Sequence, residues 1–136
     1  MRPSRLTIAA AAVLALEALA LLVVTLMEVF GLSSGAATSL PSALGLIGLS
    51  AVGAVGLGAL SFAVLRGRSF GRSGGMVVQI LAIAVALSAL TVRPFPVVFV
   101  LALVVPGAIG AALLFLLTRR AGAEARRSAD AEHRDD

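Results

Sequence analysis

Two glutamates lie within the first long apolar segment of this chain of 136 residues. Glu17 comes eleven residues after Leu6, about 16 Å along a helix, and therefore near the middle of a bilayer core about 30 Å thick. Glu28 follows eleven residues later, close to three full turns, so both carboxyl groups lie on one helix face. A carboxylate in the middle of an apolar helix is costly when charged, and such residues often bind protons or ligands. Glu17 is therefore the first candidate for a functional residue.

Polar side chains in other apolar segments could complete a site around Glu17. When the segments are aligned by depth in the membrane, Ser50 and Ser88 are candidate hydrogen-bond partners for its carboxyl group. Gln79, nearer the cytoplasmic side, could continue a polar path. Two interpretations stay open: Glu17 is a proton or ligand site, or it is a protonated acid that hydrogen-bonds neighbouring helices together.

The sequence offers few other groups that could do chemistry. It contains no cysteine and one histidine, His133 in a polar tail, so a metal site with several converging ligands is not expected. The glycine-rich segment 66–75 lacks the lysine and the preceding strand of a nucleotide-binding loop. The sequence has no zinc-binding His-Glu pair, no nucleophile elbow and no second carboxyl group beside Glu17. We therefore expect no metal, no cofactor and no enzymatic activity.

Four apolar segments must position these residues. Of all residues, 60% are hydrophobic and 13% are charged, far from the composition of a soluble domain. A membrane-spanning helix needs about 20 apolar residues. Segments near that length are 6–30, 43–65, 76–92 and 95–118. They predict an all-α, polytopic membrane protein of one domain, with four transmembrane helices in an up-and-down bundle. The polar tail over 121–136 is expected to be disordered or a frayed continuation of the fourth helix.

The arginines set the expected orientation. Ten of the eleven lie at the N-terminus, between the second and third segments, or after the fourth, and one lies on the other side. Because positive residues favour the cytoplasmic side, both termini and the connection between the second and third segments are expected in the cytoplasm. In that connection, Arg66, Arg68 and Arg72 are expected to contact lipid head groups. The remaining arginine, Arg93, lies at the depth of Glu28, which predicts an ion pair near the outer interface.

The composition also indicates the setting of the protein. All basic residues are arginine, and alanine, glycine, leucine and valine dominate, a bias typical of GC-rich bacterial genomes. The sequence pI is 11.6, but the arginines are not interleaved with aromatic residues as on nucleic-acid-binding surfaces. We therefore expect a bacterial plasma-membrane protein that contacts anionic lipids on the cytoplasmic side and binds no nucleic acid.

Small residues indicate where helices approach each other. Gly53, Gly56 and Gly58 lie in the second segment, and small residues let membrane helices pack closely, so this segment is expected at a helix interface. In the fourth segment, Pro106 removes one helical hydrogen bond and is followed by Gly107, which predicts a kink near the bilayer centre.

Four short helices and one glutamate midway along the first, within Leu14-Ala15-Leu16-Glu17-Ala18, resemble the small multidrug resistance transporters. The resemblance implies a Glu17 that binds protons and cationic substrates in turn within an antiparallel homodimer. The chain departs from that family because it has no tryptophan or tyrosine for an aromatic substrate box. Through Ala15-Leu16-Glu17-Ala18 and the segment 66–72, the chain also looks like small four-helix actinobacterial membrane proteins of unknown function.

Two functions are compatible with these features. The first is a non-enzymatic accessory or structural protein that assembles with copies of itself or with a larger membrane complex through its glycine-lined faces. The second is a small proton-linked transporter or channel that uses Glu17 at the midplane. The surroundings of Glu17 discriminate between them, because a carrier needs access to this carboxyl group and a structural role does not.

Overall fold

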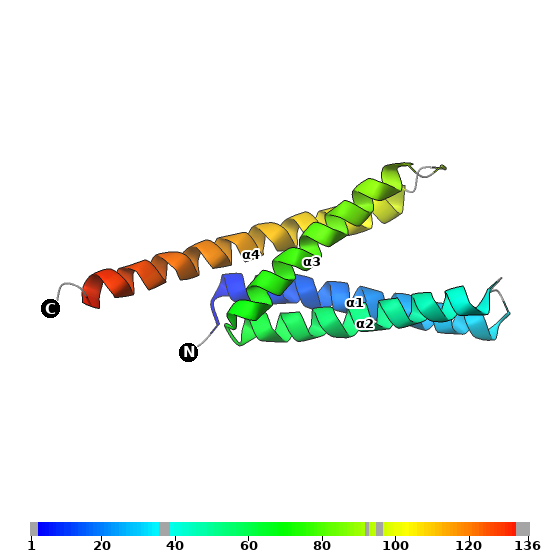
Figure 1. The fold of residues 1–136 in the computed structure, drawn as a ribbon, viewed down its shortest axis with the longest axis horizontal. Helices are drawn as coiled ribbons and strands as arrows, with labels where there is room; N and C mark the ends of the chain where they lie inside the picture. Colours follow the sequence, from blue (N-terminus) through cyan, green and yellow to red (C-terminus); the bar gives the residue numbers. More distant parts are fainter. Residues whose placement is uncertain (1–2, 36–38, 92, 95–96, 133–136) are drawn as a thin grey trace.

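The computed structural model describes residues 3–35, 39–91, 93–94 and 97–132, and over these residues the protein is all-helical. The elements are α1 (Arg5–Ser33), α2 (Leu40–Leu65), α3 (Ser69–Ser88), the short 3-10 helix η1 (Ala89–Thr91) and α4 (Val97–Glu132). Successive long helices run in opposite directions (Figure 1). The prediction of an all-α, four-helix, up-and-down fold is therefore confirmed.

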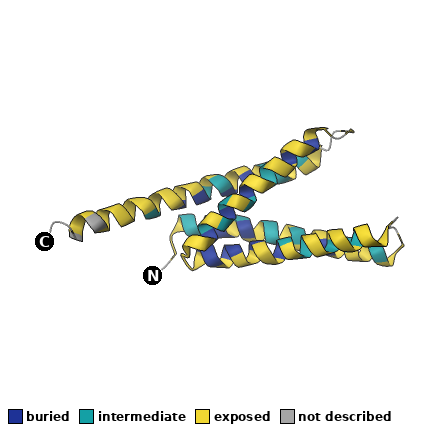
Figure 2. Cartoon of the chain, in the orientation of Figure 1, coloured by how far each residue is buried: buried dark blue, intermediate teal, exposed yellow. Residues whose placement is uncertain are grey.

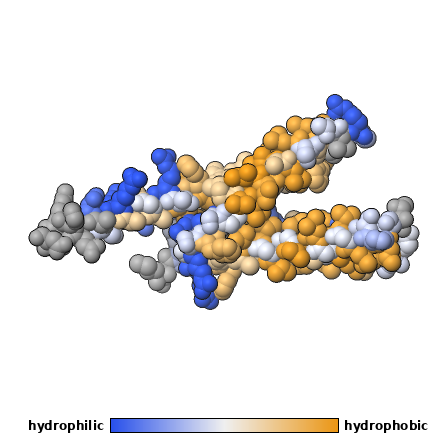
Figure 3. Space-filling view, viewed as in Figure 1, coloured by the Kyte–Doolittle hydropathy of each residue, from blue (hydrophilic) through white to orange (hydrophobic). Residues whose placement is uncertain are grey.

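All four long helices have the length and composition of membrane-spanning segments. Most of their large apolar side chains are exposed, and Figure 3 shows apolar surface along much of the length of the helices. Exposed apolar surface of this extent is stable in lipid rather than in water. The protein thus has the features of a multi-pass integral membrane protein.

The helices form two hairpins, α1–α2 and α3–α4, that pack at one end and diverge toward the other (Figure 1). We call these the closed end, where α1 begins, and the open end, where α4 begins. Buried residues gather where the hairpins meet (Figure 2). The core consists of Ala10, Ala11, Leu14, Leu57, Leu60, Val64, Leu114 and Leu117. Toward the open end, a wedge-shaped gap with apolar sides separates the hairpins (Figure 3).

Local signals fix where the helices begin and end. At the start of α1, the Ser4 hydroxyl caps the helix by accepting a hydrogen bond from the Thr7 backbone N–H. Pro41 lies in the first turn of α2, where backbone N–H groups make no hydrogen bond within the helix, so the N–H that proline lacks is not needed. After α2, Gly67 adopts a φ of +68°, which reverses the chain at little steric cost.

Helix α3 begins earlier than the sequence predicts. We expected a loop over 66–75 and a helix from residue 76, but α3 begins at Ser69, so only residues 66–68 connect it to α2. The glycines that suggested a loop are close-contact positions. A Cβ atom on Gly71 would lie 2.6 Å from the Val64 backbone nitrogen, and one on Gly74 would lie 2.7 Å from Leu60 Cδ2. These glycines let α3 pack directly on α2.

Helix α4 is longer than predicted. It continues to Glu132, so of the two alternatives for 121–136 the structure shows the continuation of the fourth helix over 121–132, and residues 133–136 lie outside the described residues. The extension contains five alanines in twelve residues, and alanine has the highest helix propensity. Adding turns to an existing helix also avoids the cost of nucleation. The predicted start at residue 95 and the predicted end of the third helix at residue 92 also lie outside the described residues.

Substitution at Gly71 tests the close approach of α2 and α3. Gly71→Ala should lower the free energy of unfolding by roughly 1–3 kcal/mol, because the added methyl group would overlap the α2 backbone. Gly45→Ala is the matched control, since nothing lies within 4 Å of a Cβ atom there. Unfolding of both variants by SDS in mixed micelles measures the difference. Equal stability of the two variants would show that α3 does not approach α2 this closely.

Candidate functional site

Glu17 and Gln79 form a direct link between the two hairpins. Gln79 of α3 donates a hydrogen bond from Nε2 to Oε2 of Glu17 in α1, at 2.8 Å. Gln79 is completely buried, and Glu17 is partly buried. No other side-chain hydrogen bond among the described residues connects the first hairpin to the second. Both residues were selected from the sequence, but their contact was not predicted.

Small residues on α3 and α4 make room for the Gln79 side chain. Gly71, Gly75 and Gln79 follow at intervals of four residues and are all buried, so they form one face of α3. On α4, a Cβ atom on Gly110 would lie 2.6 Å from Gln79 Nε2, and one on Gly107 would lie 3.5 Å from Oε1. Glycine at these two positions therefore gives α4 the smooth surface against which the amide packs. Neither Gly75 nor Gly110 was selected as a site residue from the sequence.

The amide of Gln79 is only half satisfied. Its Oε1 atom is buried and has no hydrogen-bond partner among the described residues. A buried acceptor without a donor costs about 1–3 kcal/mol. An ionised Glu17 can accept a hydrogen bond from the Gln79 amide, whereas a neutral Glu17 has an O–H that the amide oxygen could accept after a small rotation. Gln79 can thus serve as a partner for both protonation states of Glu17.

The structure does not bring Ser50 or Ser88 to Glu17. The Ser50 hydroxyl donates to Oε2 of Glu28 at 2.5 Å, nearer the open end, and the Ser88 hydroxyl donates to the Val85 carbonyl within α3 at 2.7 Å. For Ser88, the depth alignment fails because α3 begins seven residues earlier than expected, about two helical turns. Gln79 therefore lies at the level of Glu17, where the alignment placed residues 85–88.

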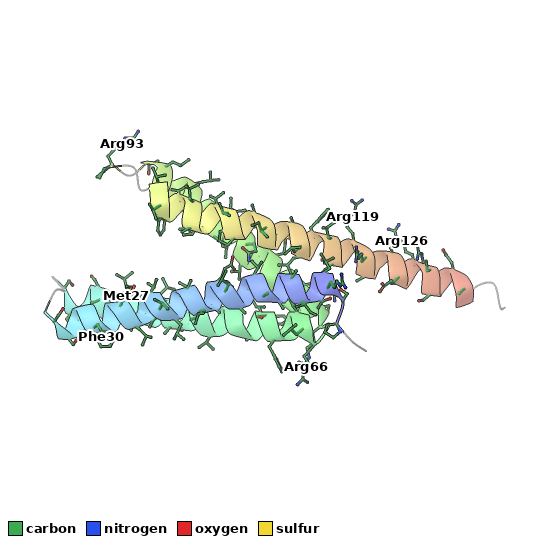
Figure 4. The ribbon with its side chains drawn as sticks, turned by 180° about the vertical axis from the view of Figure 1, so that it is seen from behind. Met27, Phe30, Arg66, Arg93, Arg119 and Arg126 are labelled. Carbon is green, nitrogen blue, oxygen red and sulfur yellow. The ribbon has the colours of Figure 1, made fainter. Side chains whose placement is uncertain are left out.

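The expected ion pair between Glu28 and Arg93 is also absent. Glu28 accepts the hydrogen bond from Ser50, and Arg93 donates from Nη1 to the Leu90 carbonyl at 3.3 Å. Figure 4 shows the cause: Arg93 lies at the end of the second hairpin, across the gap from Met27 and Phe30. Because the hairpins diverge toward the open end, equal depth along the helices does not bring these two side chains together.

No family model, curated protein or solved structure matches this chain. The similarity to the small multidrug resistance transporters and to actinobacterial membrane proteins therefore remains an expectation from the residues quoted above. Any function must be inferred from the site and the surface of this chain.

The glycines of α2 differ in their surroundings. A Cβ atom on Gly53 would lie 3.1 Å from Leu21 Cδ1, so this residue faces α1. Gly56 and Gly58 would meet nothing within 4 Å, and the same holds for Gly45 and Gly48. Within one chain, Gly53 is therefore a packing position, whereas Gly56 and Gly58 meet no other helix, so a helix contact at these two positions stays a prediction. These glycines are available to another helix.

The remaining predicted residues lie in or near turns. The guanidinium group of Arg66 lies 4.5 Å from the centre of the Phe62 ring, and Arg72 donates from Nη1 to the Gly67 carbonyl at 3.1 Å. Arg66 and Arg68 are exposed at the closed end, and Arg66 points outward there (Figure 4). In α4, Pro106 lies inside a helix that continues without interruption from Val97 to Glu132, so the proline does not break it.

Proposed function

We propose that this protein is a non-enzymatic, integral membrane protein that assembles with copies of itself or with a larger complex through the exposed face of α2. The observation that carries the proposal is the contrast among its glycines. The three glycines of α3, and also Gly107 and Gly110 of α4, lie so close to a neighbouring side chain or backbone that an added Cβ atom would touch or overlap it. Gly45, Gly48 and Gly56 of α2 are equally small but face no neighbour within the chain.

Three of the four open glycines of α2 share one side of the helix. At 100° per residue, Gly45, Gly48 and Gly56 lie within about 80° of one another. The same side carries buried Ala63 near the closed end, where it packs on α3, whereas the three glycines, nearer the open end, meet no neighbour within the chain. Exposed Val52 lies between them in the same sector. In lipid, close backbone approach and the resulting van der Waals contacts drive helix association. Another transmembrane helix could therefore approach α2 closely along this face.

The Glu17–Gln79 pair supports a structural role for the buried carboxyl group. Gln79 is sealed between α3 and α4, and the pair links the two hairpins where they pack. In this proposal the pair holds the assembly-competent arrangement of the hairpins, and the open face of α2 binds the partner. Glu17 then needs no access to water.

A second candidate function, a proton-linked carrier, is favoured by one observation. Glu17 is only partly buried, and the amide beside it can pair with either of its protonation states. Glu17→Gln removes titration but keeps the size of the side chain and its capacity to hydrogen-bond. The assembly proposal predicts equal proton flux for the parent and Glu17→Gln in proteoliposomes. A loss of flux in Glu17→Gln, with flux retained in a Glu28→Gln control, would instead establish the carrier.

The proposed orientation has its own test. The arginine distribution places both termini and the α2–α3 connection in the cytoplasm. Ser34 follows α1 at the open end, and Ser69 is the first residue of α3 at the closed end. Cysteines introduced at these positions should react with a membrane-impermeant reagent from opposite sides, with Ser34→Cys labelled in intact cells and Ser69→Cys only after lysis. Labelling of both from one side would rule out four membrane crossings.

A further inference from the structure

Helix α4 extends well beyond the apolar part of the chain. Its apolar segment ends at Thr118, and the helix continues for fourteen residues to Glu132, about 21 Å at 1.5 Å per residue. Figure 1 shows this extension projecting past the closed end of the α1–α2 hairpin. Its described side chains are exposed, except for partly buried Ala121. The extension is therefore a helical surface without a partner in the chain.

One face of the extension has the shape of a helix-packing site. Arg119, Gly122, Ala123 and Arg126 line a shallow hollow on α4. Their spacing of i, i+3, i+4 and i+7 is that of the four-residue hole that receives a side chain from a facing helix. Gly122 and Ala123 form a low floor, and a Cβ atom on Gly122 would meet nothing within 4 Å. Figure 4 shows Arg119 and Arg126 pointing to the same side, away from the α1–α2 hairpin.

The charges of this face select the partner. The two arginines are seven residues apart, about 10.5 Å along the axis, which matches carboxylates at positions i and i+7 of a second helix. Arg119 also rests over the Phe115 ring at 5.5 Å, at the membrane-proximal edge of the hollow. An apolar side chain between the two carboxylates would fill the space above Gly122 and Ala123.

A second copy of this face does not fit the hollow. Whether two such faces run parallel or antiparallel, arginine opposes arginine across the interface, and only glycine and alanine lie between. Lipid accounts for part of the face only. The head-group layer is about 5–8 Å thick, whereas Arg126 lies eight residues, about 12 Å, beyond the last apolar turn of an upright α4.

We propose that the hollow formed by Arg119, Gly122, Ala123 and Arg126 is a docking site for an acidic amphipathic helix of another protein. The facing helix inserts a large apolar side chain between the two arginines and pairs its flanking carboxylates with them. This surface lies beyond the apolar segment of α4, so it is separate from the α2 face and does not depend on the function proposed above.

The test uses the full chain in nanodiscs of neutral phosphatidylcholine and a labelled synthetic helix as the probe. The peptide, of about 20 residues so that it can be helical alone, carries leucine flanked by glutamates at i and i+7. Binding is measured by fluorescence anisotropy. Arg119→Gln with Arg126→Gln should weaken binding about tenfold, as expected for the loss of two exposed ion pairs. Gly122→Leu, which fills the hollow and keeps both charges, should weaken it at least as much.

The control is the double variant Arg120→Gln with Arg127→Gln. It removes two positive charges, as the first double variant does, but both residues lie outside the hollow. This control should bind within about threefold of the parent. The proposal is overturned if the peptide does not bind the parent, or if both double variants lose the same affinity. It is also overturned if adding anionic phosphatidylglycerol to the nanodiscs abolishes peptide binding, because the arginines would then be lipid ligands.

Discussion

Gln79→Leu should lower the free energy of unfolding by about 1–3 kcal/mol. The variant keeps an apolar side chain of similar size between α3 and α4, but it leaves the Glu17 carboxyl group without the donor that lies 2.8 Å away. A carboxyl group in a membrane interior that loses its partner must either stay unpaired or pull the hairpins apart to reach water. SDS titration in mixed micelles, followed by circular dichroism, measures the change.

A double-mutant cycle separates the pair from general packing effects. Glu17→Leu alone should be less harmful than Gln79→Leu, because a neutral amide is less costly to leave unpaired than a carboxyl group. The double variant, Glu17→Leu with Gln79→Leu, should lose less stability than the sum of the two single variants, since neither polar partner remains. Glu28→Gln is the control, because Glu28 bonds to Ser50 within the first hairpin. Strictly additive losses would show that the hydrogen bond contributes nothing to stability.

The sequence is sufficient to predict the number and type of the helices. Long apolar segments separated by glycine, proline or arginine have few alternatives to transmembrane helices, because a backbone in lipid must satisfy its own hydrogen bonds. The limits of α3 were harder to predict. Gly71, Gly74 and Gly75 have the composition of a flexible loop, and only the proximity of α2 explains them as contact positions. Composition alone cannot distinguish a glycine that permits a turn from one that permits close approach.

Two of the four residues predicted for the candidate site lie together, but their pairing was not predicted. Glu17 and Gln79 were selected because each is a polar residue in an apolar segment. Their contact depends on where α3 begins and on how α3 packs against the first hairpin. Both follow from packing rather than from local sequence. The same cause explains the absent pair of Glu28 and Arg93, since depth along a helix specifies a neighbour only where helices are parallel and close. The divergence of the hairpins toward the open end has no signal in the sequence that we can identify.

The other large effect is expected on the exposed face of α2. Gly48→Leu with Gly56→Leu should weaken assembly roughly tenfold or more, because two leucines would hold a partner helix away from the α2 backbone. Neither residue touches another part of its own chain, so the stability of the monomer should not change. Gly58→Leu is the matched control, since a Cβ atom on Gly58 also meets nothing within 4 Å but lies about 120° from the centre of the open glycine sector.

The size of the particle extracted in a mild detergent tests the proposed function most directly. Native mass spectrometry of the parent should detect more than one chain, or one chain with a copurified membrane subunit. The variant with Gly48→Leu and Gly56→Leu should be a monomer with the same unfolding free energy as the parent, and Gly58→Leu should assemble as the parent does. A parent that is monomeric and alone after extraction, or a glycine variant that assembles unchanged, would contradict assembly through α2.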